Sequence, residues 1–333
     1  MHRAVVLLSL FTLTAGGAAL LPAGGAQAAV QMRPKPAQHA AADTASEQRQ
    51  VLTYWTEQRM EAAQPLDAPG PKKGAKMALG EPAEGTPWTA PPTGATRAGA
   101  ELQAARSSGG PWTGSGAVVK TTGRVFFTTQ GRNASCSGSA VTSANKSVVL
   151  TAGHCVKLNG TFHTNWVFVP GYNAGNRPSG TWAATKLLTT QQWNASEDIN
   201  FDVAAAVVAP LEGKTLVDVV GGQGVAFNQG RRQQMYAFGY PAAAPYDGSK
   251  LIYCSGRTFD DFLMSQDHGL TCNMTGGSSG GPWMLNFNES TGLGTQNSVN
   301  SFKYNFAPNW MFGPYFGNEA QNVYQAAQST NAL

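Results

Sequence analysis

The sequence has 333 residues, of which 42% are hydrophobic and 13% charged, and a net charge of +4 at pH 7. From Ser107 to the C-terminus it contains 13 basic and 11 acidic residues without a basic cluster, so a nucleic-acid-binding protein is not expected. Without its N-terminal segments, the chain is long enough for one large all-β unit or two small barrels.

The first residues have the pattern of an export signal. Met1–Arg3 is basic, Ala4–Leu21 is almost wholly apolar, and Ala26–Ala28 supplies the small residues that signal peptidase requires. A transmembrane anchor is disfavoured, because glycines and a proline interrupt the apolar run and no stop-transfer charges follow it. We therefore expect residues 1–28 to be a signal peptide, and the product to be secreted and extracellular, without membrane contact after export.

Residues 29–106 differ in composition from the rest of the chain. The segment from Thr44 to Ala63 is rich in Ala, Gln, Glu and Arg, which predicts one helix. A Pro/Gly/Thr/Ala tract follows from Pro65 to Gly99 and is expected to be flexible, because it can bury little apolar area. We interpret residues 29–106 as a propeptide and residues 107–333 as the folded domain, which we expect to be a monomer.

The domain contains many short strands. Runs of β-branched and aromatic residues alternate with Gly, Asn and Ser clusters, which is typical of an all-β sandwich or barrel. The predicted strands are residues 123–129, 147–151, 165–169, 203–208 and 234–240. Helical periodicity is confined to a short C-terminal helix, residues 319–328.

An even number of cysteines in an exported chain indicates disulfides. The four cysteines allow three connectivities, and the simplest one joins sequence neighbours. It pairs Cys136 with Cys155 and Cys254 with Cys272. A metal site is disfavoured, because there is no C-x-x-C spacing and no His-rich segment. We expect neither a metal nor a cofactor.

The run from Gly276 to Pro282 has the properties of a nucleophile loop. Ser279 is flanked by glycines, which permit a tight backbone turn and close approach of a substrate, and an apolar strand-like segment follows directly. The run also contains the G-x-S-x-G pattern of α/β-hydrolases. That fold needs a histidine after the serine, and no histidine follows Ser279. The α/β-hydrolase alternative is therefore rejected.

A candidate base and its orienting carboxylate precede this serine. His154 lies in a small-residue turn after a predicted strand, beside Cys155, whose disulfide would hold the turn. Asp202 directly precedes an apolar strand, where it would be buried as an orienting carboxylate must be. Asp198 is the alternative, but its polar surroundings predict that it is solvated. We therefore favour Asp202.

These three segments resemble those of the chymotrypsin-like serine peptidases, in the order His, Asp, Ser typical of that family. The likeness extends over about Gly110 to Phe316 and is greatest to the bacterial secreted branch that includes the glutamyl endopeptidases. It implies two six-stranded antiparallel β-barrels with the active site between them. It also implies catalysis by His154, Asp202 and Ser279, with the backbone N–H groups of Gly277 and Ser279 as the oxyanion hole.

Some positions depart from the family's pattern. Ser278 replaces the common aspartate before the nucleophile, so activation through an ion pair between that residue and a new N-terminus is not expected. Asn273 matches the position at the base of the substrate pocket, and its lack of charge argues against selection of Arg or Lys. The histidine that glutamyl endopeptidases carry after the nucleophile is absent. The preferred residue before the cleaved bond is therefore left open.

The resemblance predicts a secreted serine endopeptidase that is made as a precursor and forms an acyl-enzyme. Its partners would be polypeptide substrates and its own propeptide. Two alternatives remain: a catalytically silent binding protein on the same fold, and an esterase, which would share every motif.

Overall fold

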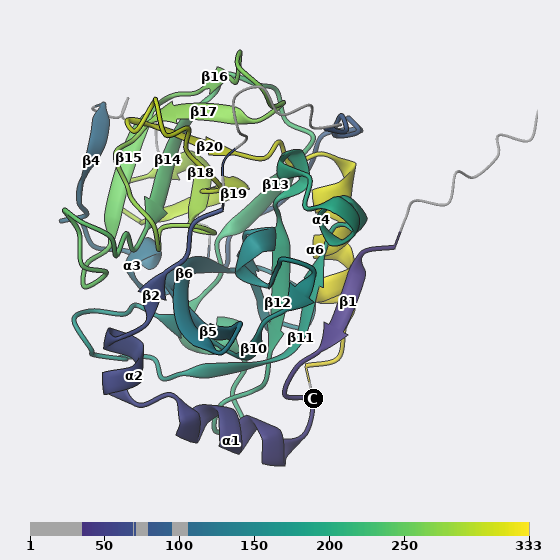
Figure 1. The fold of residues 1–333 in the computed structure, drawn as a ribbon, viewed down its shortest axis with the longest axis vertical. Helices are drawn as coiled ribbons and strands as arrows, with labels where there is room; N and C mark the ends of the chain where they lie inside the picture. The colour runs from purple at the N-terminus through teal and green to yellow at the C-terminus, as the bar shows by residue number, and fades with distance from the viewer. Residues whose placement is uncertain (1–34, 69, 71–78, 95–105, 333) are drawn as a thin grey trace, which may run out of the picture. The chain divides into compact units, whose positions relative to one another are not determined.

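The computed structural model describes residues 35–68, 70, 79–94 and 106–332 (Figure 1). The predicted signal peptide, residues 1–28, lies outside the described residues. Within the described part of the chain, no helix is both long and apolar enough to cross a bilayer.

The first half of the domain is a closed barrel. Its six strands pair in the order β5-β6-β7-β12-β11-β10, and β10 pairs with β5 to close the ring. All six ladders are antiparallel. The strands are β5 (Thr122–Thr129), β6 (Arg132–Val141), β7 (Val148–Thr151), β10 (Thr164–Pro170), β11 (Trp182–Thr189) and β12 (Ala204–Val208). Apolar side chains such as Leu150, Phe168 and Val207 fill it, and burial of such side chains is the main favourable term in folding.

The second half divides its strands between two sheets. The larger follows the order β13-β19-β18-β14-β15, and β17 of the smaller sheet packs against β15. The strands are β13 (Gly224–Phe227), β14 (Gln234–Gly239), β15 (Ile252–Arg257), β16 (Phe259–Asp260), β17 (His268–Thr271), β18 (Pro282–Asn288), β19 (Leu293–Val299) and β20 (Trp310–Gly313). The all-β fold and the short C-terminal helix, α6 (Asn318–Gln328), are confirmed.

The remaining elements are short. Two hairpin strands and several single-turn helices connect the barrel strands. They are α3 (Ala117–Thr121), η1 (Gly153–Cys155), β8 (Lys157–Leu158), β9 (Thr161–Phe162), α4 (Gln191–Ser196), η2 (Ile199–Phe201) and α5 (Leu216–Val220). The disulfides Cys136–Cys155 and Cys254–Cys272 are formed, which confirms the predicted pairing.

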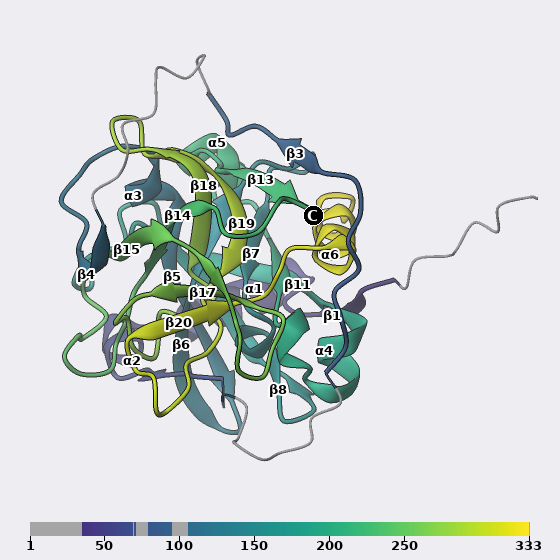
Figure 2. The same cartoon turned by 90° about the horizontal axis from the view of Figure 1, so that it is seen from above.

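The N-terminal region adds strands to both halves. Its strand β1 (Ala37–Ala40) pairs antiparallel with β11, β2 (Gln64–Pro65) pairs parallel with β6, and β3 (Trp88–Ala90) pairs antiparallel with β13. Figure 2 shows β3 beside β13 and α6. The start of the predicted domain, β4 (Ser107–Pro111), pairs with β15. Three described segments before Ser107 are thus held on the domain by backbone hydrogen bonds.

The single helix predicted over Thr44–Ala63 is wrong in detail, because the structure has two helices there. The first, α1 (Ala45–Tyr54), begins with a capping box formed by Thr44, and the second, α2 (Glu57–Glu61), begins at Thr56, whose hydroxyl accepts from the N–H of Arg59. Between them, the indole of Trp55 donates to the carbonyl of Asn165 at 2.5 Å. This contact with the barrel and the second cap together break the helix.

The predicted flexible tract is partly ordered. Residues 79–94 lie against the domain through β3 and through side chains that satisfy their backbone. Gly85 N donates to Asn228 Oδ1 at 2.9 Å, and Ala83 O accepts from Asn318 N at 2.9 Å. The flexibility predicted from composition is therefore wrong for residues 79–94, because their hydrogen-bond partners lie elsewhere in the chain. Residues 71–78 and 95–105 of the tract lie outside the described residues.

His163 makes stability depend on pH. Its ring stacks on Phe127 and its Nε2 donates to the carbonyl of His154 at 2.9 Å, and burial lowers the pKa of His163 from 6.5 to about 4. A histidine held neutral in the folded state stabilises it fully above the unfolded pKa, and this contribution is lost as pH falls towards the folded pKa. We expect the unfolding free energy of the wild type to fall by about 3 kcal/mol relative to that of His163→Phe between pH 7 and pH 4.

Urea unfolding of both proteins in a Ser279→Ala background, which prevents any self-digestion, measures this difference. A difference that stays constant with pH would contradict the argument.

Candidate active site

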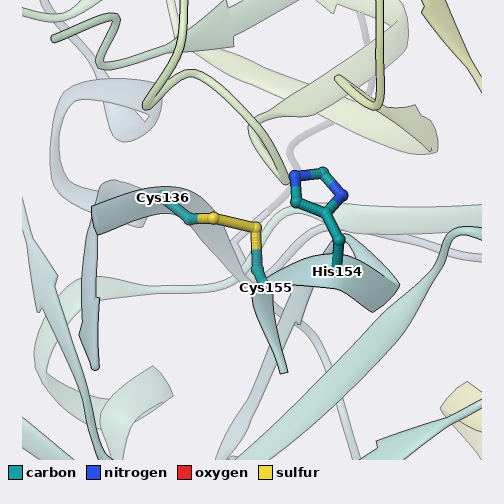
Figure 3. A group of neighbouring side chains, drawn as sticks. All are labelled: Cys136, His154 and Cys155. Carbon is teal, nitrogen blue, oxygen red and sulfur yellow. A yellow bond between two sulfur atoms is a disulfide. The ribbon is translucent and has the colours of Figure 1, made fainter. Parts of the chain in front are cut away.

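His154 is held in one orientation. It lies in η1, directly after β7, and its neighbour Cys155 is tied to β6 through Cys136 (Figure 3). The backbone N–H of His154 donates to Asp202 Oδ1, and its Nδ1 donates to Asp202 Oδ2, both at 2.8 Å. Because Nδ1 carries the proton of this bond, the lone pair of the neutral ring lies on Nε2.

Asp202 is fully buried between η2 and β12. Besides its two bonds to His154, its Oδ2 accepts from the hydroxyl of Ser301. Hydrogen bonds of this kind compensate the carboxylate for the water that it loses on burial. Asp202, the predicted orienting carboxylate, thus contacts His154 directly, and Ser301 is a partner that no motif indicates.

Asp198 is not solvated, contrary to the expectation from its polar neighbours. It is 6% exposed and accepts from Gly80 N at 2.6 Å and from Asn200 N at 3.1 Å. Burial raises the pKa of Asp198 against the effect of these bonds. Its partner Gly80 belongs to the N-terminal region, so Asp198 helps to hold that region and does not contact His154.

Ser279 lies in a loop that both halves of the domain fix. Gly277 and Gly280 adopt φ values of +90° and +79°, which glycine adopts without strain. The N–H of Ser137 in β6 donates to Ser279 O at 2.7 Å, and Gly280 N donates to Asn300 O at 2.7 Å. A Cβ on Gly280 would come within 2.1 Å of the hydroxyl of Thr151, so this position also requires glycine.

The carbonyl oxygen of Leu66 lies at the nucleophile. Gly277 N, one of the two predicted oxyanion-hole donors, points at Leu66 O from 3.4 Å, and Ser279 Oγ donates to the same oxygen at 3.2 Å. The buried Nε2 of His154 has no hydrogen-bond partner among the described residues. The serine is therefore bound to the N-terminal region and not to His154.

A cavity of about 760 Å³ adjoins Ser279. The predicted pocket residue Asn273 lines it and accepts a 2.7 Å hydrogen bond from the hydroxyl of Tyr246. Lys303 also lines it, with its ammonium donating to the carbonyls of Cys272 and Pro308, and burial lowers the pKa of Lys303 to about 8.

Asp67 lines the same cavity from the N-terminal region. It keeps an exposed edge, but its carboxylate lies against Gly276, where a Cβ would meet it at 2.5 Å. Loss of water raises the pKa of Asp67, and electrostatic interaction with His154 and Lys303 acts in the opposite direction. The cavity is therefore shared between the domain and the segment that crosses it.

Cys136, His154 and Cys155 also lie close enough together to suggest a metal site (Figure 3). Both sulfurs are used in the disulfide, so neither is available as a thiolate ligand. The cluster orients His154 and offers no set of metal ligands.

The comparisons agree with this geometry. No protein-family model and no curated protein matches the chain. Among solved structures, the protease Anisep from Arthrobacter nicotinovorans is 45% identical, with 65% of this chain and 99% of Anisep covered and a TM-score of 0.61. The thermostable serine protease AL20 from an extremophilic microorganism is 46% identical, with 65% and 100% covered and a TM-score of 0.61. This chain belongs to the chymotrypsin-like serine peptidases.

A more distant structure, a Glu endopeptidase in complex with MPD, is 15% identical and shows the fold alone. The match covers 67% of this chain and 97% of the Glu endopeptidase, with a TM-score of 0.53.

Several residues at the site of this chymotrypsin-like peptidase carry no sequence signal. Ser301 and Lys303 lie after the nucleophile in a run without a recognisable motif, and Leu66 and Asp67 lie in a tract that composition marks as a linker. Their importance follows only from the long-range contacts described above. One feature of the sequence could have indicated this contact: Leu66 is an apolar residue within a Pro-rich tract.

The two aspartates provide a direct test of the carboxylate assignment. In the mature peptidase, Asp202→Asn should lower kcat about ten-thousand-fold, because an amide stabilises the wrong tautomer of His154 and cannot balance its positive charge. Asp198→Asn should leave kcat close to the wild-type value, since within the domain Asp198 accepts from Asn200 N and is not hydrogen-bonded to His154. Hydrolysis of fluorescent casein measures both. A larger loss for Asp198→Asn would reverse the assignment.

Proposed function

We propose that this chain is a secreted serine endopeptidase, made as a precursor, in which His154, Asp202 and Ser279 perform acyl transfer. The observation that carries the proposal is the buried His154–Asp202 pair beside the nucleophile loop. Among the described residues, the Nε2 lone pair of His154 has no partner, and the Sγ of its neighbour Cys155 lies 3.6 Å from the carbonyl oxygen of Ser279. A base and a nucleophile in such proximity are what acyl transfer requires.

In this mechanism, Ser279 Oγ attacks the substrate carbonyl carbon while His154 Nε2 takes the hydroxyl proton. The N–H groups of Gly277 and Ser279 stabilise the oxyanion, and Asp202 stabilises the imidazolium. Collapse breaks the C–N bond, and His154 gives its proton to the leaving amine, which leaves an ester on Ser279. A water molecule, deprotonated by His154, then attacks this ester and releases the acid and the free serine.

Polypeptides are the proposed substrates, as the names of the similar proteases suggest. An esterase would use the same residues, and only the relative rates on peptides and esters distinguish it. A catalytically silent binding protein is disfavoured, because binding alone would not require the buried pair together with the glycine-flanked serine.

Export and processing complete the proposal, with residues 1–28 as signal peptide, 29–106 as propeptide and 107–333 as peptidase. Two disulfides are typical of an oxidising compartment outside the cytoplasm. The similar proteases are covered over 99% and 100% of their length by 65% of this chain, and residues 107–333 make up a similar share. The disulfides support export, and the coverage supports a mature enzyme that lacks the N-terminal region.

A fluorophosphonate probe tests the nucleophile. We expect the mature protein to gain the mass of one adduct, and Ser279→Ala, cleaved to the same mature mass by a trace of active enzyme, to gain none. Ser290→Ala, which changes an exposed serine on the β18–β19 turn, is the matched control and should be labelled like the wild type. Intact-mass measurement gives the result. Labelling of Ser279→Ala, or no labelling of the mature wild type, would refute the mechanism.

N-terminal sequencing tests the processing. The active protein from culture fluid should begin between Lys72 and Gly116, where the composition changes and the chain leaves the N-terminal elements. An active enzyme that begins near Ala29 would show that the N-terminal region is not a propeptide.

A further inference from the structure

The segment Gln64–Ala68, here called the cleft segment, crosses the candidate active site. It enters as β2, parallel to β6, and Leu66 N donates to Ser135 O at 3.0 Å. Leu66 O then accepts from Ser279 Oγ and lies 3.4 Å from Gly277 N. Asp67 and Ala68 continue along the cavity beside the nucleophile. Leu66, Asp67 and Ala68 thus contact the nucleophile loop or line the cavity beside it.

We propose that the cleft segment is a built-in inhibitor, bound in a non-productive register that blocks Ser279 and escapes cleavage. The inference rests on the proposed function, since it assigns a regulator to the same site. It applies to this chain's own N-terminal region, whether that region is still joined to the domain or has been cut from it.

The register is non-productive because the residue that places its carbonyl at the nucleophile is not the residue that lines the pocket. In an acylating substrate, the residue whose carbonyl lies in the oxyanion hole also places its side chain in the pocket. Here Leu66 supplies the carbonyl, but its side chain packs against an apolar cluster that contains Trp193 and Leu158. The pocket is lined instead by Asp67 and Ala68. The Leu66 carbonyl is therefore not presented as an acyl donor with a seated side chain.

The hydrogen bonding also opposes reaction. Attack requires Ser279 Oγ to direct a lone pair at the carbonyl carbon and its proton at His154 Nε2. In the structure, Oγ directs its proton at the oxygen of Leu66, and no residue in the described part of the chain bonds Nε2. The nucleophile is therefore hydrogen-bonded to the cleft segment and not to its base.

Charge helps to seat the segment. Asp67 is the only acidic residue that lines the cavity, and Lys303 is the only basic one, within the described chain. Each of the two charges favours the ionised form of the other. Since Asp67 is partly exposed to solvent, this attraction is screened and adds little to the strength with which the segment binds.

Elements on both sides anchor the segment. Before it, β1 pairs with β11 and Trp55 donates to Asn165 O, and after it, β3 pairs with β13. Tethering of this kind gives a weak contact a high effective concentration at its site. A cut after residue 94 would leave these anchors in place. We therefore expect that cleavage alone does not open the site, and that the N-terminal region must also leave or be degraded.

The labelling rate of uncut precursor tests the proposal, because intact mass separates labelled precursor from labelled mature enzyme. We expect wild-type precursor to react with a fluorophosphonate at least about tenfold more slowly than mature enzyme. Leu66→Asp places a charge against the Trp193 cluster and should raise the precursor's rate about tenfold. Thr53→Asp, the same new charge on the exposed face of α1, should leave the rate unchanged.

Leu66→Ala, which removes packing without adding charge, covers the case in which Leu66→Asp does not fold, and should give a severalfold increase. Equal labelling of wild-type precursor and mature enzyme would overturn the inference, as would unchanged rates in both Leu66 variants. A cut between Leu66 and Asp67 in the N-terminal fragments would show productive binding and would overturn it as well. If the mature enzyme is not labelled, the proposed function itself fails, which is a separate outcome.

Discussion

The antiparallel ladder between β7 and β12 determines the geometry of the catalytic pair. Its register places Thr151 opposite Ala204, so the chain leaves β7 at the same end at which it enters β12. His154 lies three residues after Thr151, and Asp202 lies two residues before Ala204. The two side chains therefore meet at one end of the barrel. A shift of the register by one residue would separate them and also turn the apolar faces of both strands outward.

The nucleophile depends on contacts between the two halves of the domain. Ser279 comes from the loop before β18, but its carbonyl accepts from Ser137 in β6, and the hydroxyl of Ser137 donates to Gly277 O at 2.9 Å. The first barrel thus holds the backbone of the second half at Gly277 and at Ser279 itself. Ser301, which follows β19, reaches back to Asp202 in the other direction. Relative movement of the halves would consequently disturb the acid, the base and the nucleophile at once.

Local pattern was enough to predict the strands and the three catalytic candidates. The predicted strands 123–129 and 203–208 differ by a residue from β5 and β12, since each is an apolar run between turn residues. Local pattern failed where a distant partner decides the outcome. Asp198 was expected to be solvated but is buried by Gly80, 118 positions earlier. The helix break at Trp55 depends on a carbonyl 110 residues away. A single sequence does not reveal such partners.

The N-terminal region illustrates why its composition was misleading. Few apolar residues mean that residues 35–94 cannot form a core of their own, and a linker is the natural reading of such a stretch. The described residues of this region are ordered because the domain supplies what they lack: strand edges for β1, β2 and β3, and apolar clusters for Val51, Trp55 and Met60. A segment that is ordered only while bound to another surface unfolds when it dissociates. Its backbone is then exposed to proteolysis. Order on the domain and disorder away from it would together make an inhibitor that is stable while bound and short-lived once released.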